Sequence, residues 1–178
     1  MAVPQAPLDD TEHGSVPAGE GWFVLNARDA RWLENELGAY CGFESLEHRF
    51  EQLGINLNVM EPGVPMCMYH WEEDQEDFLV LSGEALLVVE GEERPLKQWD
   101  LVHCPRRARH VIVGAGAGPC VVLAVGSRQA DEDWGAYPVD EVALRHGAGV
   151  EQETTEPKEA YARFSRPAPT PYREGWLP

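Results

Sequence analysis

Four residues whose side chains can bind a metal ion lie in the middle of this 178-residue chain. One residue separates His70 from Glu72, Glu76 follows four residues later, and His110 lies further along. Alternate side chains of a strand share a face, so His70 and Glu72 should point the same way. Imidazole and carboxylate groups suit one divalent transition metal such as Mn, Fe, Co, Ni or Zn. If their strands are neighbours, these four residues can meet around one ion.

The strands that would position these residues lie between about Leu46 and Val125. Short apolar or alternating runs are separated there by Gly, Pro and acidic turns, and the short connections exclude a parallel α/β sheet. This pattern predicts an antiparallel sandwich or small barrel. The runs of strand length are Ile55–Met60, Met66–Trp71, Phe78–Leu81, Ala85–Val89, Leu101–Cys104, His110–Val113 and Cys120–Val125.

The spacing also resembles the two sequence motifs of the cupin superfamily. The first motif runs from a glycine through His-x-His to a glutamate and a second glycine, and this chain has Gly63, His70, Glu72, Glu76 and Gly83 there. Glu72 therefore takes the place of the second histidine. One additional residue separates Gly63 from His70.

The second cupin motif is matched at its proline and histidine, Pro105 and His110. Its two glycines and its asparagine are replaced by Trp99, Arg107 and Gly114. The resemblance covers about Leu53 to Gly126. It implies metal binding by His70, Glu76 and His110, with Glu72 filling the second histidine position.

For the whole chain we predict an all-β fold: a single antiparallel double-stranded β-helix, or jelly-roll, barrel. We expect one N-terminal helix, a short C-terminal helix and an extended tail around it. The expected divisions are a flexible lead at 1–20, a strand and helix packing on the barrel at 21–45, the cupin barrel at 46–126 and a C-terminal extension at 127–178.

The flanking elements follow from local signals. Trp22–Leu25 is an apolar strand candidate, and Asn26 could cap a helix over Ala27–Leu37 that Gly38 ends. Pro157 at a first helical position predicts a short helix over Pro157–Phe164.

Seven residues are candidates for lining the pocket. Met66 and Met68 share the parity of His70, Phe78 and Val80 follow Glu76, and Ile112 shares the face of His110. Two amides alternate with apolar residues and lie either in the pocket or in water. These are Asn56 and Asn58.

Two alternatives to a metal site also fit the sequence. The acidic run at 72–77 could be a solvated turn, and the barrel could have kept its shape and lost its ion. Burying Glu72 and Glu76 without a cation would cost several kcal/mol, which favours an occupied site. For His103 we prefer a hydrogen-bonded side chain to a metal ligand.

Charge and composition exclude several classes of function. The chain has 14 Lys and Arg against 31 Asp and Glu, a formal net charge of −17, so we expect no binding to nucleic acid or an anionic membrane. Its apolar runs are too short to span a bilayer. The N-terminus has an acidic pair rather than a basic start, and the four cysteines form no CxxC pair. We therefore expect a cytoplasmic protein with reduced thiols.

The leading functional hypothesis is a small metal-dependent enzyme of the dioxygenase or isomerase/epimerase type. Its small-molecule substrate would be oxygenated, and two carboxylates near the ion favour a neutral polyol, sugar or phenol-like molecule. The alternative is a non-catalytic ligand-binding module with a structural metal. We also expect a homodimer, because the aromatic tail offers apolar surface that two copies could bury; the opposing possibility is that the tail packs within the chain.

Overall fold

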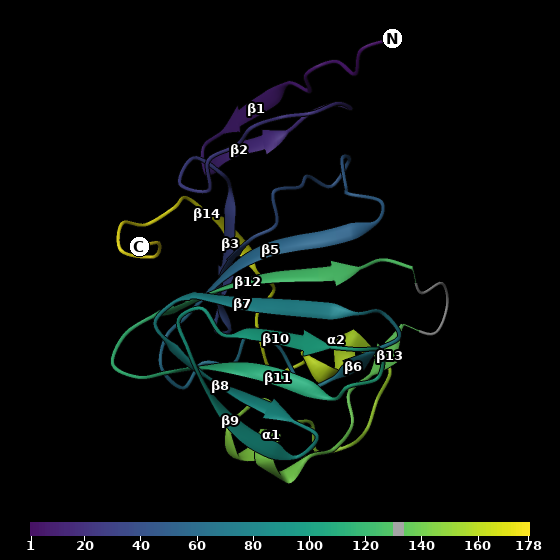
Figure 1. Cartoon of the computed structure of the whole chain (residues 1–178), viewed down its shortest axis with the longest axis vertical. Helices are drawn as coiled ribbons and strands as arrows, with labels where there is room; N and C mark the ends of the chain where they lie inside the picture. Colours follow the sequence, from purple (N-terminus) through teal and green to yellow (C-terminus); the bar gives the residue numbers. More distant parts are fainter. Residues whose placement is uncertain (130–133) are drawn as a thin grey trace.

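The computed structural model describes residues 1–129 and 134–178, which form mainly antiparallel strands in two facing sheets (Figure 1). The larger sheet has the strand order β10-β7-β12-β5-β4-β3-β14. Its strands are β3 Trp32–Asn35, β4 Gly38–Cys41, β5 Leu53–Met60, β7 Glu76–Ser82, β10 Leu101–Cys104, β12 Cys120–Ser127 and β14 Ala168–Thr170. The smaller sheet has the order β11-β8-β9, with β8 Glu84–Val89, β9 Glu92–Lys97 and β11 His110–Ala115.

Two short strand pairs and two short helices accompany these sheets. They are β1 Leu8–Thr11 with β2 Gly14–Pro17, β6 Trp71–Glu72 with β13 Gly135–Ala136, α1 Glu141–Arg145 and α2 Pro157–Ala160. Within the described ranges, no helix is both long and apolar enough to cross a membrane.

The main core lies between the two sheets and uses one side of β5, β7, β8, β10, β11 and β12. Phe78 and Val80 of β7, Val122 of β12 and Ile112 of β11 are buried there. Successive side chains point to opposite faces of a strand, so an alternating sequence produces one buried face. For this reason the strands predicted between Leu46 and Val125, other than Met66–Trp71, are confirmed to within two residues at each end.

The closed barrel is the first correction. Among the described residues neither sheet closes on itself: β10 and β14 are the edges of the larger sheet, and β11 and β9 those of the smaller. The two sheets are joined by packing of their apolar faces rather than by a continuous ladder of hydrogen bonds.

The N-terminal helix is the second correction. The range Ala27–Leu37 contains β3, and the residues after it turn into β4 to form a hairpin. Asn35 stabilises the turn because its Oδ1 accepts the Leu37 N–H at 2.9 Å. Gly38, expected to end a helix, has φ of 94° and approaches the β5 backbone so closely that a Cβ would lie 2.4 Å from the Val59 carbonyl oxygen.

The chain ends also differ from expectation. The lead at 1–20 contains the β1–β2 hairpin, which projects from the body (Figure 1), and Trp22–Leu25 forms only a single bridge, from Trp22 to Gln5. Helix α2 begins at Pro157 but ends at Ala160. The tail packs within the chain: β14 pairs with β3, and the Trp176 ring lies 5.1 Å from the Trp32 ring.

Candidate functional site

Three potential ligands from separate segments meet between the two sheets. Glu76 begins β7, His110 begins β11, and His70 directly precedes β6. The backbones of His70 and His110 hydrogen-bond to each other in both directions, at 3.1 and 2.8 Å. This pairing brings two histidines that are distant in sequence side by side.

The side chains of these three residues converge. One ligand-type atom from each lies within 4.8 Å of the other two. Glu76 Oε2 is 3.3 Å from His110 Nε2 and 3.4 Å from His70 Nε2. Both histidines are buried, and the Glu76 side chain is 18% exposed. We call His70, Glu76 and His110 the trio.

The orientation of the imidazoles fits a bound cation. Nδ1 of His70 lies 2.8 Å from the Met68 carbonyl oxygen, and Nδ1 of His110 lies 2.9 Å from that of Ala108. A carbonyl only accepts hydrogen bonds, so each Nδ1 carries a proton and a neutral ring presents its Nε2 lone pair to Glu76. His110 Nε2 and Glu76 Oε2 are buried and have no hydrogen-bond partner among the described residues. Lone pairs that face a carboxylate repel it unless a cation lies between them, so the trio fits a divalent metal ion.

Without an ion, the same groups are arranged to take up protons. Burial by itself lowers the pKa of His110, but the Cys104 thiol and the Glu76 carboxylate raise it to about 9. Burial by itself raises the pKa of Glu76, but His110 and His70 lower it to about 2. A metal ion would therefore have to displace protons from the histidines when it binds.

Glu72 lies beside the trio rather than within it. Its Oε1 is 3.4 Å from His70 Nε2, and its side chain is 31% exposed. The set of mutually close ligand atoms does not include it. Sequence position therefore places Glu72 near the site, whereas the structure brings only the other three predicted ligands into one group.

A cavity of about 360 Å³ adjoins Glu72 and Glu76. Asn56 and Ser127 also line it, and Gly126 leaves room beside the trio, because a Cβ there would lie 3.6 Å from Glu76 Cγ. Of the trio, Glu76 lines this cavity, so the three potential ligands have open space on the side of Glu76. Catalytic metal sites keep an open position beside three protein ligands, whereas structural sites are closed by a fourth ligand. We call this space the trio cavity.

The residues predicted to line one pocket lie in the core and in two separate cavities. Phe78, Val80 and Ile112 pack in the core between the sheets, where the Phe78 ring lies 5.2 Å from the His110 ring. Asn56 lines the trio cavity, whereas Asn58 lines a second cavity that the trio does not border.

The two methionines do not share a face as predicted. Residues 66–69 are not a regular strand. Isolated bridges join the residues on either side of this stretch, Pro65 and His70, to β11. Met66 lines the second cavity. Met68 is buried elsewhere, in a cluster with Tyr137 and Ala160. Parity counting fails wherever the backbone departs from an extended strand.

Two tyrosines beside His70 were not among the predicted site residues. The Tyr137 ring lies 6.0 Å from the His70 ring. The Tyr161 hydroxyl accepts the Met68 N–H at 3.1 Å, and the Met68 carbonyl in turn holds His70 Nδ1. Both tyrosines come from the C-terminal extension, which has no fixed spacing from the two motifs. Their aromatic side chains were the one sequence signal that could have suggested a role near the site.

Part of the chain is similar to known proteins. Residues 56–126 match the family model "Cupin domain". A search of curated proteins gives no match. Many solved structures match, including a proposed sugar phosphate isomerase from Acidithiobacillus ferrooxidans (34% identity, 44% of this chain and 51% of that one, TM-score 0.42). A cupin 2 domain-containing protein from Halorhodospira halophila aligns at 24% identity over 54% of this chain and 64% of that one, with a TM-score of 0.44.

A third structure shares the fold over a larger part of both chains. It is the polyketide cyclase RemF from Streptomyces resistomycificus, with 16% identity, 63% of this chain and 89% of that one covered, and a TM-score of 0.51. At this identity the likeness concerns the fold alone. The chain spans between half and two thirds of the length of the first two structures named above.

Proposed function

The chain belongs to the cupin superfamily through residues 56–126, and from this premise we propose that it is a metal-dependent enzyme acting on a small oxygenated molecule. The observation that supports the proposal is the buried trio, whose Nε2 and Oε2 atoms face one another without hydrogen bonds beside an open cavity. We propose that His70, Glu76 and His110 hold one divalent transition metal.

The donor set favours one reaction class. Two histidines and one carboxylate with open positions are typical of non-haem Fe(II) oxygenases, so we favour a dioxygenase over an isomerase or epimerase. When bound, such an ion would supply Lewis-acid polarisation and a coordination site for substrate oxygen. The Met68 and Ala108 carbonyls orient the two imidazoles for that role.

Glu72 and Asn56 have roles that follow from their place in the trio cavity. We propose that the partly exposed Glu72 carboxylate accepts a proton from a substrate hydroxyl, and that the Asn56 amide orients a substrate oxygen. A cavity of about 360 Å³ with these polar groups suits a small phenol-like, sugar or polyol substrate.

The test combines metal content with turnover. Protein purified without metal-affinity resin is analysed for metals and then assayed for O₂ consumption with catechols, sugars and keto acids. We expect about one ion per chain and O₂ consumption that Glu72→Gln abolishes while the metal remains. Absence of stoichiometric metal contradicts the site. A full metal load without turnover on any substrate favours the non-catalytic module with a structural metal, and metal loss in Glu72→Gln makes Glu72 a ligand.

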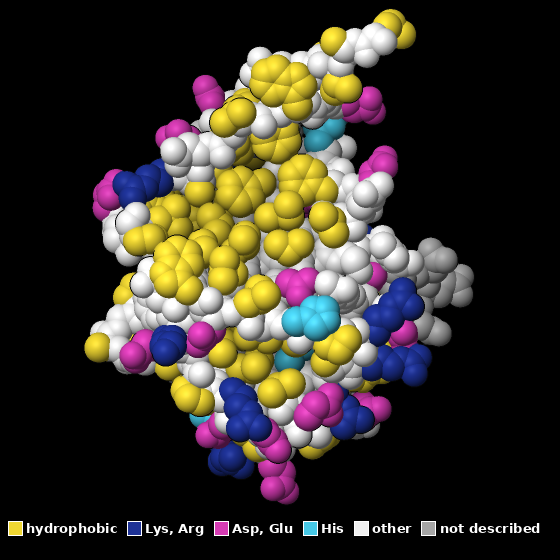
Figure 2. All heavy atoms as spheres, in the orientation of Figure 1, with side chains coloured by type: hydrophobic (Ala, Val, Ile, Leu, Met, Phe, Trp, Pro, Cys, Tyr) yellow, Lys and Arg dark blue, Asp and Glu magenta, His cyan; other side chains and the backbone are white. Residues whose placement is uncertain are grey.

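We also propose that the chain acts as a homodimer. The tail aromatics pack internally, so the support comes from the outer face of the larger sheet, where Figure 2 shows apolar side chains gathered over β5, β12 and β7. On this side of β10, Leu101 is 68% exposed. Light scattering should give twice the chain mass, and Leu101→Asp should halve it; a monomeric wild type contradicts the dimer.

Four free cysteines support a reducing compartment such as the cytoplasm.

A further inference from the structure

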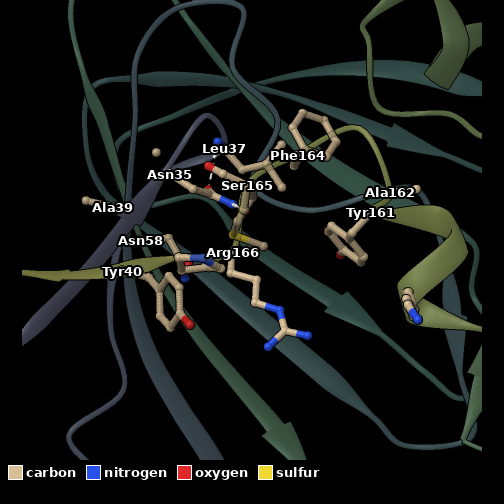
Figure 3. Close-up of a pocket in the computed structure, with 14 residues that line it drawn as sticks. Asn35, Leu37, Ala39, Tyr40, Asn58, Tyr161, Ala162, Phe164, Ser165 and Arg166 are labelled. Carbon is tan, nitrogen blue, oxygen red and sulfur yellow. Dashed lines mark hydrogen bonds between the residues drawn. The ribbon is translucent and has the colours of Figure 1, made fainter.

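A second cavity, larger than the trio cavity, lies between the β3–β4 turn, the β4–β5 pair and the segment after α2 (Figure 3). Its volume is about 570 Å³, within the range of small-molecule sites. Tyr40 and Asn58 line it from the sheet, and Tyr161, Phe164 and Arg166 line it from the C-terminal extension. We call this space the α2 cavity.

The charge of the α2 cavity is opposite to that of the protein. The chain carries 31 acidic and 14 basic side chains, yet among the residues that the structure describes no Asp or Glu lines this cavity, while Lys158 and Arg166 do. Neither cation has an ion pair among the described residues. Two unpaired cations in an otherwise acidic molecule create a local site of positive potential.

The remaining lining supplies both polar and apolar contacts. Asn35 is already used by the turn, since it accepts the Leu37 N–H and donates to the Ser165 carbonyl. Asn58 makes no side-chain hydrogen bond within the described part of the chain, so its amide is available to a ligand. Figure 3 shows the Arg166 guanidinium and the Tyr40 hydroxyl on one side of the cavity and the Phe164 ring on the opposite side.

From this arrangement we propose that the α2 cavity binds a small organic anion with an apolar body, an aryl or short alkyl carboxylate or phosphate monoester. Arg166 and Lys158 would pair with the anionic group, and guanidinium offers two parallel donors to such a group. The ring of Phe164 would cover the apolar body. No member of the trio lines this cavity, so the site goes beyond the proposed metal chemistry.

The experiment titrates the full-length, metal-loaded protein with three matched probes by calorimetry: benzoate, phenyl phosphate and neutral benzyl alcohol. We expect one anion per chain to bind at least tenfold more tightly than the alcohol. The ratio of benzoate to phenyl phosphate affinity identifies which anionic group the site prefers. If neither anion binds more tightly than the alcohol, the proposal is wrong.

Matched variants locate the binding. Arg166→Gln and Lys158→Gln should each weaken anion binding about tenfold, whereas Arg106→Gln, which removes an exposed arginine that lines a different cavity, should change it less than twofold. Equal weakening by Arg106→Gln would mean non-specific charge attraction and overturn the proposal. Ala162→Trp adds a large ring from an exposed wall position and should abolish binding without disturbing the core.

A last variant separates this site from the metal centre. His110→Ala should lose metal but bind the anion within about twofold of the wild type. Loss of anion binding in folded His110→Ala would contradict an independent α2 site, whereas metal without anion binding in the wild type would leave the proposed function standing and overturn only this inference.

Discussion

Glu76 and Asp77 are neighbours on β7 and both approach histidines, but on opposite faces of the larger sheet. Glu76 points inward, where its Oε2 faces the Nε2 atoms of two buried histidines without a hydrogen bond. Asp77 points outward, and its Oδ1 lies 2.7 Å from Nδ1 of His103, an imidazole that is 55% exposed. The outer Asp77–His103 pair forms its own hydrogen bond, whereas the inner group leaves Glu76 Oε2 and His110 Nε2 without a hydrogen-bond partner among the described residues.

The difference shows that residue type does not decide what a histidine and a carboxylate do together. Outside, water and a direct hydrogen bond satisfy both groups. Inside, backbone carbonyls take the Nδ1 protons, and the remaining lone pairs converge where water cannot satisfy them. The hydrogen-bonded interpretation of His103 therefore agrees with the structure, although His103 lies at the surface rather than in the core.

The largest effect should come from removing one histidine on each face. We expect His110→Ala to reduce bound metal from about one ion per chain to less than a tenth, because two ligands remain. His103→Ala should keep the full amount. Elemental analysis after dialysis measures both, and retention of metal by folded His110→Ala contradicts the inner site.

The two adjacent carboxylates provide a finer comparison. Glu76→Gln keeps the shape but removes the negative charge, so metal affinity should fall at least about 100-fold. Asp77→Asn should change it less than threefold. Competition with a chromophoric chelator measures both affinities, and similar losses in the two variants would remove the distinction between the faces.

The metal-free protein should depend on pH through the inner group. The pKa of His110 is raised to about 9, so its stabilising contribution is complete below its ordinary value of 6.5 and is lost as pH rises through about 9. The lowered pKa of Glu76, about 2, adds stability above 4.5 that is lost only as pH falls towards 2. Tm of chelator-treated protein should therefore fall between pH 6.5 and 9. His110→Ala should flatten this slope and His103→Ala should not; an unchanged slope in His110→Ala would show that other groups cause it.

Tyr161 tests how the inner histidine is held. Tyr161→Phe leaves the Met68 N–H without its acceptor, which should cost about 1 kcal/mol of unfolding free energy and weaken metal binding up to about tenfold. Urea unfolding and chelator competition provide the two values. Metal affinity equal to that of the wild type would limit Tyr161 to a structural role.

The smallest effect should come from breaking the outer pair. His103 is exposed, so His103→Ala should lower the unfolding free energy by less than about 0.5 kcal/mol. A loss of several kcal/mol in urea unfolding would contradict a weak contribution of this exposed pair.

Much of the fold could be read from alternation alone. Phe78 and Val80 marked β7 correctly because a strand with one buried face must alternate. Strand β9, Glu92–Lys97, escaped prediction because its mostly exposed residues have no apolar face. The helix predicted over Ala27–Leu37 was wrong for a different reason. Ala30, Leu33 and Leu37 fit a helical spacing, but the segment contains a strand whose Trp32 is fully buried in the cluster that the tail covers.

The order of residues along the chain was enough to establish which side chains could bind a metal and that His110 begins a strand, since spacing and parity are local properties. Only the tertiary structure decided that Glu72 stays outside the trio, that Met68 faces away from Met66, and that Tyr161 supports His70 from the C-terminal extension. Those outcomes depend on irregular backbone and on contacts between remote segments, where burial and hydrogen bonding, not sequence distance, determine which atoms meet.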